Sequence, residues 1–422
     1  MKVMVIGGGG REHAIVRALK KSPEISELYV LPGNGGIAAD ARCVAIGAGD
    51  LAGQVEFARE NAVDFAVVAP DDPLVMGAVD ALEAAGIPCF GPDKKAAILE
   101  GSKVFSKNLM KKYGIPTAEY ATFSDAEAAL AYLETASIPA VVKADGLALG
   151  KGVIIAQTRE EARRAVISMM KEGLFGDSGS KVVIEEFLTG PEVSVLSFTD
   201  GETLIPMVSS MDHKRALDND RGLNTGGMGT VAPNPYYTEA IAAECMEKIF
   251  LPTVRAMAAE GRPFRGCLYF GLMLTADGPK VIEYNCRFGD PETQVVLPLL
   301  ESDLLTVMRA CREGTLGKTE VKFSDKSACC VIMASRGYPE SYEKGYEITV
   351  DADCEAELCF AGAREDEGKL ITSGGRVLGV VTTAGTLRGA VDKAYAQVEK
   401  IHFGNAYYRR DIGQRALRAP EG

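Results

Sequence analysis

The sequence has few of the residues from which metal centres and disulfide frameworks are built. It contains three histidines, and its ten cysteines are scattered without a C-x-x-C pair. A zinc site is therefore not expected. Most cysteines stand in apolar surroundings such as "SACCVIM", where cysteine behaves as a small buried hydrophobe. Unpaired cysteines are typical of a reducing compartment, and we expect a cytoplasmic protein.

Long apolar runs and repeats are also missing. No run approaches the roughly 20 residues of a membrane span, and "MKVMVIGGGG" fits a first β-strand better than a secretion signal. The net charge of −12 argues against a broad nucleic-acid surface, although it leaves room for local phosphate pockets. We therefore expect small molecules, and neither membrane nor nucleic acid, as partners of a monomeric protein.

A length of 422 residues is too great for one core. In the first hundred residues, apolar strands alternate with helices at Arg11 to Lys20, Leu51 to Glu60 and Leu74 to Ala85. The strands are "KVMVI", "ELYVL", "CVAIG" and "FAVVA". Continuous apolar strands between helices predict an α/β domain with a parallel, Rossmann-like sheet.

After a helix at Ser102 to Tyr113, the pattern changes to a small α+β unit with strands "AVVKA", "VIIAQ" and "KVVIEEF". Two Asp-Gly pairs, at residues 200–201 and 277–278, then predict antiparallel hairpins. We expect an N-terminal domain at 1–101, a central two-lobed domain at 102–325 and a small C-terminal α+β domain at 326–422.

One strand end carries polar groups of mixed sign. Alternation along "VIEYNCRFGDPET" predicts that one face holds Val281, Glu283, Asn285 and Arg287, and the other Ile282, Tyr284 and Cys286. Carboxylate and amide oxygens suit a hard cation such as Mg²⁺, often together with phosphate. A guanidinium suits a carboxylate or phosphate. The alternative is a solvated strand end.

Two glycine-rich loops are candidates for phosphate binding. "GGGGREH" follows a strand and opens a helix, where backbone N–H groups hold anions. Glu12 or His13 occupies the third glycine position of a dinucleotide fingerprint, which favours a smaller phosphate ligand or a ligand-free turn. "KADGLALGKGV" departs from a Walker A loop, and Lys143 and Lys151 at its ends favour a flap that closes over phosphates.

Two further segments have binding character. "VVIEEFLTGPEVS" is an apolar strand with an acidic end, which could form a slot for a nucleotide base with Glu192 near a ribose. The long polar segment "DHKRALDNDRGLNTGGMG" has the composition of a binding loop. His213 within it could equally be a structural histidine.

Together these stretches resemble the ATP-grasp ligases, and within them the phosphoribosylamine–glycine ligase family. The resemblance covers essentially the whole chain and is carried most specifically by "GGGGREH", "DHKR…NTGGMG" and "NCRFGDPE". It implies an ATP-grasp fold, with a mobile lid at about 118–190, and ligation of glycine to 5-phosphoribosylamine. ATP activates glycine as glycyl phosphate, and the products are glycinamide ribonucleotide, ADP and phosphate, as a step of purine synthesis.

The resemblance also implies residue roles. The metal, Mg²⁺ or Mn²⁺, would bind Glu283 and Asn285. ATP would contact Lys103, Lys143, Gly146, Lys151, Glu185, Glu186, Leu188 and Glu192. Phosphoribosylamine would contact Gly8, Gly9, Gly10, Arg11, Asn34, Lys214, Asn224, Thr225, Gly226 and Gly227. Asp212, Arg287 and Asp290 would grip glycine and the acyl phosphate, and with Lys214 they form the candidate catalytic set.

Some positions depart from the family pattern. Asp71 replaces a longer carboxylate, Leu223 stands where proline is common, and Gly271 to Leu274 offer no earlier acidic metal ligand. The alternatives are another purine-pathway ATP-grasp ligase, an ATP-binding regulatory protein without ligase activity, and a nicotinamide-dependent dehydrogenase. The last is disfavoured by the broken fingerprint.

Overall fold

The N-terminal unit is built on a parallel sheet. The computed structural model describes residues 1–148 and 152–419. Five strands pair in the order β3-β2-β1-β4-β5, and every pair is parallel, as the sequence predicted. The strands are β1 (Lys2–Gly7), β2 (Glu27–Pro32), β3 (Arg42–Cys43), β4 (Phe65–Val68) and β5 (Cys89–Phe90).

Helices separate and follow these strands along the chain. They are α1 (Gly10–Leu19), η1 (Ile37–Ala39), α2 (Leu51–Glu60), α3 (Asp71–Met76), α4 (Ala78–Ala84) and α5 (Lys94–Gly101). The single helix predicted over Leu74 to Ala85 is wrong, because Gly77 takes a left-handed conformation at φ +100 and separates α3 from α4. Of the strand predicted at "CVAIG", only Cys43 lies in a strand, as the second residue of β3.

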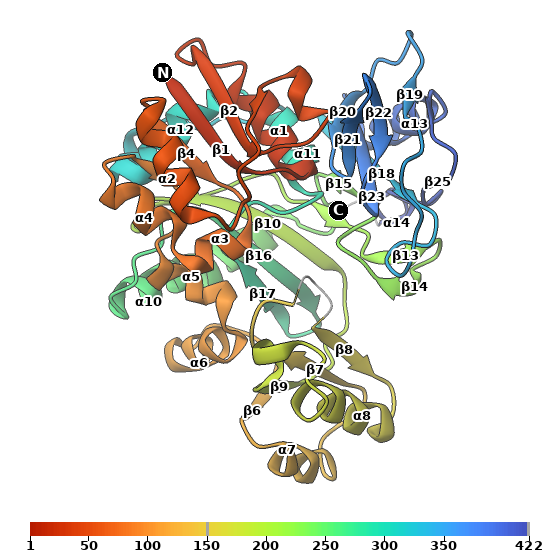
Figure 1. The fold of residues 1–422 in the computed structure, drawn as a ribbon. Coiled ribbons are helices and arrows are strands. Elements are labelled where there is room, and N and C mark those ends of the chain that lie inside the picture. The colour runs from red at the N-terminus through yellow and green to blue at the C-terminus, as the bar shows by residue number, and fades with distance from the viewer. Residues whose placement is uncertain (149–151, 420–422) are drawn as a thin grey trace.

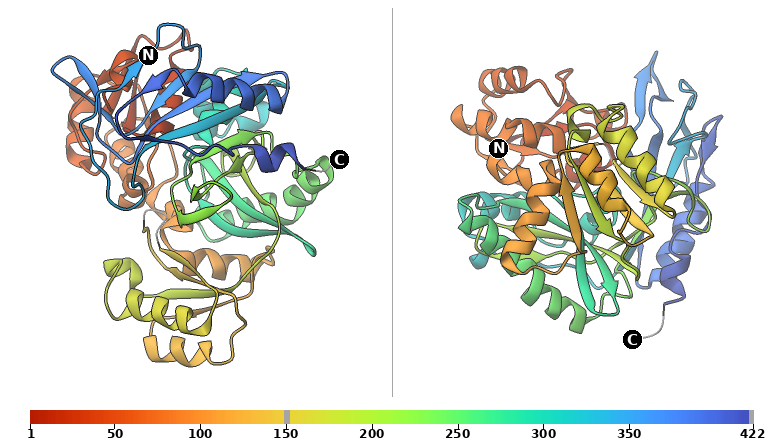
Figure 2. Two further views of the ribbon diagram at one scale, coloured as in Figure 1. Left: turned by 90° about the vertical axis from the view of Figure 1, so that its right-hand side faces the viewer. Right: turned by 90° about the horizontal axis from the view of Figure 1, so that it is seen from below.

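A small α+β unit follows α6 (Lys103–Tyr113) and projects away from the remainder in Figure 1 and in the left view of Figure 2. Its antiparallel sheet has the order β6-β9-β7-β8. Its elements are β6 (Tyr120–Phe123), α7 (Ala126–Leu133), β7 (Ala140–Ala144), β8 (Val153–Ala156), α8 (Arg159–Met170), η2 (Gly176–Gly179) and β9 (Val182–Glu186).

The second lobe of the central region is the antiparallel sheet β11-β10-β16-β17. Its strands are β10 (Glu192–Thr199), β11 (Leu204–Pro206), β16 (Gly266–Thr275) and β17 (Gly278–Asn285), so both Asp-Gly hairpins are confirmed. The π-helix η3 (Met246–Phe250) lies between α9 (Glu239–Cys245) and α10 (Leu251–Ala259). Phe250 and Tyr284 both pack on Phe270 in the core beneath this sheet.

A β-bulge changes which residues of β17 share a face. Gly271 pairs with Glu283, but the next residue, Leu272, pairs with Val281, so Ile282 is an extra residue. Val281 therefore points into the same core as Tyr284 and Cys286. The predicted grouping of Val281 with Glu283 and Asn285 is wrong, because the bulge interrupts strict alternation.

The C-terminal sheet takes strands from two parts of the chain. It contains β12 (Met211–Asp212), β15 (Gly229–Ala232), β18 (Ser327–Ser335), β23 (Arg376–Ala384), β20 (Glu357–Phe360) and β25 (Ala406–Tyr407), with α13 (Leu387–Val398) packed on it. The predicted domain limits stay predictions, but the segment 211–232 joins this sheet long before residue 326. This crossing brings the loop from Asn224 to Gly227 beside the C-terminal region.

Shorter elements complete the fold. Two hairpins pair β13 (Arg215–Leu217) with β14 (Arg221–Asn224) and β21 (Ala363–Asp366) with β22 (Lys369–Thr372), and a separate antiparallel pair joins β19 (Thr349–Val350) to the distant β24 (Ile401–His402). The remaining helices are α11 (Thr293–Val296), η4 (Leu297–Leu299), α12 (Leu304–Glu313), η5 (Leu316–Lys318) and α14 (Gln414–Leu417). Within the described residues, helices that are both long and apolar enough to cross a bilayer are absent. Eight of the ten cysteines are buried, as their apolar contexts predicted.

Candidate active site

The predicted metal ligands lie at the end of β17, beside several lysines. The carboxylate of Glu283 is 3.9 Å from the ammonium of Lys214. Burial alone would raise the pKa of Glu283, but the positive charges of Lys214, Lys143 and Lys103 lower it below its ordinary value. Asn285 donates its amide N–H to the carbonyl of Tyr284 at 2.8 Å, which leaves its amide oxygen for a ligand.

The two lysines predicted to hold ATP phosphates come from different elements, α6 and β7, and the charge of each acts on Glu283. Lys103 is the first residue of α6, and its ammonium donates to the carbonyl of Gly146 at 3.0 Å. Lys143, on β7, donates to the carbonyl of Ile282 at 3.1 Å. The start of the second glycine-rich loop therefore lies beside the N-terminus of α6. Lys151, also predicted to contact ATP, lies outside the described residues.

The predicted adenine edge is connected to Lys143 by a buried carboxylate. Glu185, at the end of β9, lies 2.9 Å from both Lys143 and Lys107. Lys107 was not predicted, although it follows Lys103 by one helical turn, which places both on one face of α6. Burial lowers the pKa of Lys107 to about 8, with Glu185 opposing the shift.

The neighbouring acidic residues have partners of their own. Glu186 accepts the backbone N–H of Glu119 at 3.0 Å and lies 3.4 Å from Lys280. Glu192, predicted beside the ribose, forms a 3.0 Å ion pair with Lys214. Glu192 raises the pKa of Lys214 well above its ordinary value, so that Lys214 remains a cation between two carboxylates.

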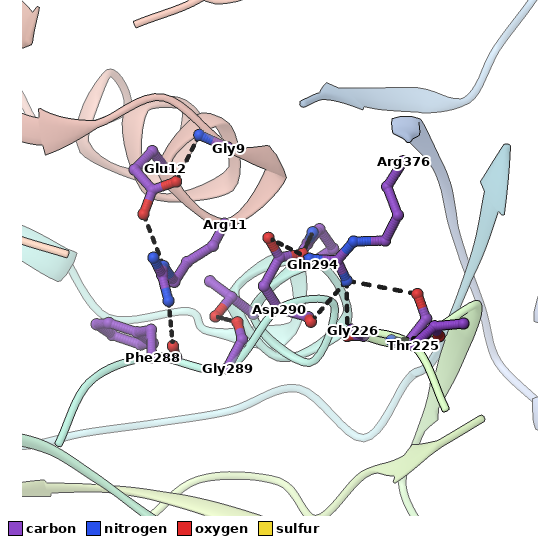
Figure 3. Close-up of polar contacts among 12 residues, drawn as sticks. Gly9, Arg11, Glu12, Thr225, Gly226, Phe288, Gly289, Asp290, Gln294 and Arg376 are labelled. Carbon is purple, nitrogen blue, oxygen red and sulfur yellow. Dashed lines mark hydrogen bonds and ion pairs between the residues drawn. The ribbon is translucent and has the colours of Figure 1, made fainter. Parts of the chain in front are cut away.

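The first glycine-rich loop is close to residues from three segments. The N–H of Gly9 donates to the Glu12 carboxylate at 2.6 Å, so the chain itself occupies this predicted anion donor. Arg11 pairs with Glu12 at 2.6 Å and donates to the carbonyl of Phe288 at 3.2 Å (Figure 3). The remaining first-turn N–H groups of α1, from Gly10 onward, lack acceptors within the helix, as at any helix start.

Asn34 ties this loop to the C-terminal region. Its amide donates to the carbonyl of Gly8 at 2.9 Å and to that of Phe360 at 2.8 Å. A side chain at Gly8 would collide with the backbone of Gly33, because an added Cβ would lie 2.5 Å from its carbonyl oxygen. Glycine is therefore required where the ends of β1 and β2 meet.

The Asn224 to Gly227 loop folds back on Lys214. The hydroxyl of Thr225 donates to the Lys214 carbonyl at 2.8 Å and accepts the N–H of Gly227 at 2.9 Å. Gly227 has φ +111, and an added Cβ would lie 2.6 Å from the nearer carboxylate oxygen of Asp212. The loop thus packs directly over Asp212.

Asp212 is partly buried near a second carboxylate, that of Glu292. Burial, and then the charge of Glu292, raise the pKa of Asp212 well above its ordinary value, against the opposing charges of Lys214 and Arg376. Its Oδ1 has no hydrogen-bond partner among the described residues. Glu292 accepts hydrogen bonds from Ser194 and Tyr269. Glu292 was not predicted as a site residue. The sequence could have indicated it only through its position in "GDPET", next to Asp290.

Arg287 is held against the N-terminal unit. Its guanidinium lies 2.9 Å from Glu100 on α5 and 3.8 Å from Asp71, the residue at the shortened-carboxylate position. Glu100 also accepts the backbone N–H of Cys286 at 2.6 Å. Phe288 packs against Phe90 and Phe198, which anchors the loop after β17 in the core. Glu100 was not predicted, because its partners are distant in sequence.

Asp290 is the last predicted residue of this loop. Gln294 donates to its Oδ1 at 2.7 Å, and Arg376 forms a 3.1 Å ion pair with its Oδ2. Burial alone would raise the pKa of Asp290, but Arg376 and Arg11 lower it. The predicted catalytic residues therefore form two neighbouring groups, with Asp212 and Lys214 in one and Arg287 and Asp290 in the other.

Comparison with known proteins accounts for the whole chain. Models of phosphoribosylglycinamide synthetase match its N domain at residues 1–100, its ATP-grasp (A) domain at 101–293 and its C domain at 328–415. A phosphoribosylamine–glycine ligase of Caldanaerobacter subterraneus is 48% identical over 413 residues, which is 98% of this chain and 99% of that protein. The chain belongs to the phosphoribosylamine–glycine ligase family.

Solved structures agree with this family. The crystal structure of a phosphoribosylamine–glycine ligase from Thermotoga maritima has a TM-score of 0.87 and 37% identity, covering 98% of this chain and 100% of that one. A biotin carboxylase domain from Hydrogenobacter thermophilus, solved with MgADP, has a TM-score of 0.74 at 17% identity, covers 96% of this chain and 91% of that one, and shows the shared fold alone.

Membership of the phosphoribosylamine–glycine ligase family fixes the general chemistry. The protein is an ATP-dependent ligase of the ATP-grasp type, and its activity is the purine-biosynthesis step that forms glycinamide ribonucleotide. The alternatives of a dehydrogenase, a regulatory ATP-binding protein and a different purine-pathway ligase are thereby set aside.

Proposed function

We propose that Glu283 and Asn285 bind Mg²⁺, which Mn²⁺ can replace, and that this ion works with ATP at the lysine-rich end of β17. The donor set fits, because an ionised carboxylate and an amide oxygen are hard ligands. Among the described residues, no group of three or more acidic, His or Cys side chains is placed to hold a metal ion. Two protein ligands suit a Mg²⁺ ion that keeps waters and phosphate oxygens. When bound, the ion neutralises phosphate charge.

The observation that carries the proposal is the placement of two lysines beside Glu283. Lys214 lies 3.9 Å from its carboxylate, and Lys143 donates to the neighbouring Ile282 carbonyl. The charge of Lys103 acts on the same carboxylate. Three cations around one carboxylate suit a polyphosphate better than a neutral ligand. In this arrangement Lys103 and Lys143 hold ATP phosphates at the start of the Gly146 loop. The adenine binds along Glu185 to Leu188, and Glu192 lies on the ribose side.

Phosphoribosylamine is assigned to the other side of the site. Gly8 to Arg11, Asn34 and the Asn224 to Gly227 loop hold its phosphate and sugar, with the first-turn N–H groups of α1 and the Arg11 guanidinium as anion donors. Arg287 and Asp290 position glycine through its carboxylate and amine, respectively. The glycine carboxylate thereby meets the guanidinium of Arg287, and the glycine ammonium meets the carboxylate of Asp290.

The reaction then has two steps. The glycine carboxylate oxygen attacks the γ-phosphorus of ATP, which releases ADP and leaves glycyl phosphate. The amine of phosphoribosylamine attacks the acyl carbon, the C–O bond to phosphate breaks, and the amine loses a proton. Asp212, whose unpartnered oxygen faces the Gly227 loop and whose pKa is raised, accepts this proton. Lys214 compensates the charge that develops on the acyl oxygen.

Isotope transfer tests this sequence. With ATP, Mg²⁺, phosphoribosylamine and glycine labelled with ¹⁸O in its carboxylate, one labelled oxygen should appear in the released phosphate. ADP release should require both glycine and phosphoribosylamine. Unlabelled phosphate would overturn the acyl phosphate route. We also infer a cytoplasmic protein, because its cysteines are unpaired, and we infer that it is a monomer. Light scattering during gel filtration measures its mass.

A further inference from the structure

The side chain of Arg376 extends from the C-terminal sheet to loops that carry assigned site residues. Arg376 is the first residue of β23, in the C-terminal sheet. Its Nη1 donates to the carbonyls of Gly226 at 2.7 Å and Asp290 at 2.8 Å, with a longer contact of 3.4 Å to that of Gly227. Its Nη2 lies 3.1 Å from the Asp290 carboxylate. Figure 3 shows the Arg376 guanidinium between Gly226 and Asp290.

These contacts join two segments that each carry assigned site residues. One is the Asn224 to Gly227 loop, and the other is the loop after β17 that contains Asp290. Most of the acceptors are backbone carbonyls, so the loops are held in place whatever their side chains. A planar guanidinium can satisfy several acceptors in one plane, whereas a lysine ammonium cannot match that fork.

The C-terminal region contacts the same glycine from a second direction. The hydroxyl of Tyr338 accepts the N–H of Gly226 at 3.1 Å, while Arg376 binds its carbonyl. Both backbone polar groups of Gly226 are therefore fixed by C-terminal residues. An added Cβ at Gly226 would lie 3.0 Å from the guanidinium carbon of Arg376, so the two residues are in close contact.

The ion pair also matters for the first glycine-rich loop. An added Cβ at Gly9 would lie 3.5 Å from the Asp290 carboxylate, which places this anion beside the turn assigned to a phosphate. Arg376 compensates the charge of Asp290. Without Arg376, Asp290 would lose its ion-pair partner and keep the smaller effect of Arg11, so a phosphate at this turn would meet a stronger negative charge that weakens its binding.

We propose that Arg376 is a positioning residue for the amine substrate, through which the C-terminal region sets the affinity for phosphoribosylamine. The proposal rests on the assignment of that substrate to Gly8 to Arg11 and Asn224 to Gly227. Among the described contacts of Arg376, none reaches Lys103, Lys143 or Glu185. The nucleotide side should therefore be unaffected by its replacement.

Binding experiments on two ligands test the proposal. Ribose 5-phosphate serves as a probe with the phosphate and sugar of phosphoribosylamine, and a non-hydrolysable ATP analogue with Mg²⁺ probes the nucleotide side. In Arg376→Lys we expect the Kd of ribose 5-phosphate to rise about tenfold, since charge remains but the fork is lost. We expect the Kd of the ATP analogue to change by less than about twofold. Arg376→Met should give a larger effect on ribose 5-phosphate.

Two further variants keep the test decisive. Tyr338→Phe removes a single hydrogen bond to Gly226 and should raise the Kd of ribose 5-phosphate by about two- to fivefold. Arg364→Lys, on the exposed β21–β22 hairpin, should leave both constants unchanged. An equal loss of both ligands in Arg376→Lys, or a loss of neither, would overturn the proposal. If wild-type protein forms product but does not bind ribose 5-phosphate competitively with phosphoribosylamine, the substrate assignment fails instead.

Discussion

The Lys214 ammonium lies 3.0 Å from the carboxylate of Glu192 and 3.9 Å from that of Glu283. A single cation therefore bridges the residue assigned to the ribose and the residue assigned to the metal. Because positive charges hold the pKa of Glu283 below its ordinary value, Glu283 is ionised at neutral pH. The ionised form is the one that binds a hard cation.

Glu283→Gln should nearly abolish ligase activity while the fold persists. The substitution removes the negative charge at almost constant volume, and we expect kcat to fall by at least about 100-fold, equivalent to about 2.7 kcal/mol. Steady-state kinetics over a Mg²⁺ titration provide the measurement, with circular dichroism to check the fold. Glu202→Gln, at the exposed turn before β11, is the matched control. Near-normal turnover at ordinary Mg²⁺ would mean that Glu283 is not a ligand.

Gly9→Ala tests the first glycine-rich loop. The backbone of Gly9 is extended, so alanine is allowed there, but its Cβ would lie 2.8 Å from the carboxylate of Glu12. We expect the KM for phosphoribosylamine to rise about tenfold, equivalent to about 1.4 kcal/mol, with little change in the KM for ATP. Gly47→Ala is the control, because its Cβ would meet nothing within 4 Å. Equal increases in both KM values would remove this loop from the amine-substrate site.

Local patterns in the sequence were enough to predict the N-terminal sheet and the hairpins of the central region, but not the entry of residues 211–232 into the C-terminal sheet. The parallel N-terminal sheet and both Asp-Gly hairpins followed from periodicity and turn chemistry. The face assignment on β17 failed at Ile282, because an inserted residue reverses alternation without leaving a mark in composition.

Contacts between distant segments were beyond the reach of these patterns. Glu100 binds Arg287 across 187 residues of sequence, and Arg376 reaches Gly226 across 150. Nothing near Arg376 in "TSGGRVLGVV" shows which loop it meets. Charge pairs of this kind depend on how domains pack, and a single sequence does not encode that packing in a local motif.

The buried charges around Glu185 give a prediction about stability. Its carboxylate lies 2.9 Å from two lysines, Lys107 and Lys143, and all three side chains are at most 5% exposed. Glu185→Gln would remove the carboxylate that lies against both buried ammonium groups, leaving Lys107 without its ion pair and Lys143 with only the charge of Glu283, and we expect a loss of about 3–5 kcal/mol in the free energy of unfolding. Lys107→Met alone should cost less, because Glu185 keeps Lys143.

The two substitutions should therefore compensate each other. In the double variant Glu185→Gln/Lys107→Met one of the two lysines that lose this carboxylate is gone, so its free energy of unfolding should exceed that of Glu185→Gln alone. Urea unfolding of the four proteins gives the coupling energy directly. Purely additive losses would show that these charges do not act as one buried group.

His213 gives a prediction about pH. Its imidazole is buried, with Nδ1 at 3.1 Å from the carbonyl of Gly229 and Nε2 accepting the N–H of Gly413 at 3.1 Å. Burial, together with the positive charge of Arg409, lowers the pKa of His213 from 6.5 to about 4, although Asp220 and Asp411 oppose the shift. This histidine therefore stabilises the fold in its neutral form.

The sign of the pH effect follows from proton binding by the unfolded chain. Below its ordinary pKa of 6.5, His213 is protonated in the unfolded state, but it stays neutral in the folded state down to about pH 4. Its stabilising contribution is present above pH 6.5 and is lost as the pH falls, by roughly 1–2 kcal/mol between pH 6.5 and pH 5. Urea unfolding at several pH values should give a shallower dependence for His213→Gln than for the wild type. His402→Gln, at an exposed position, should keep the wild-type slope. If His213→Gln also keeps that slope, His213 does not couple folding to pH in this range.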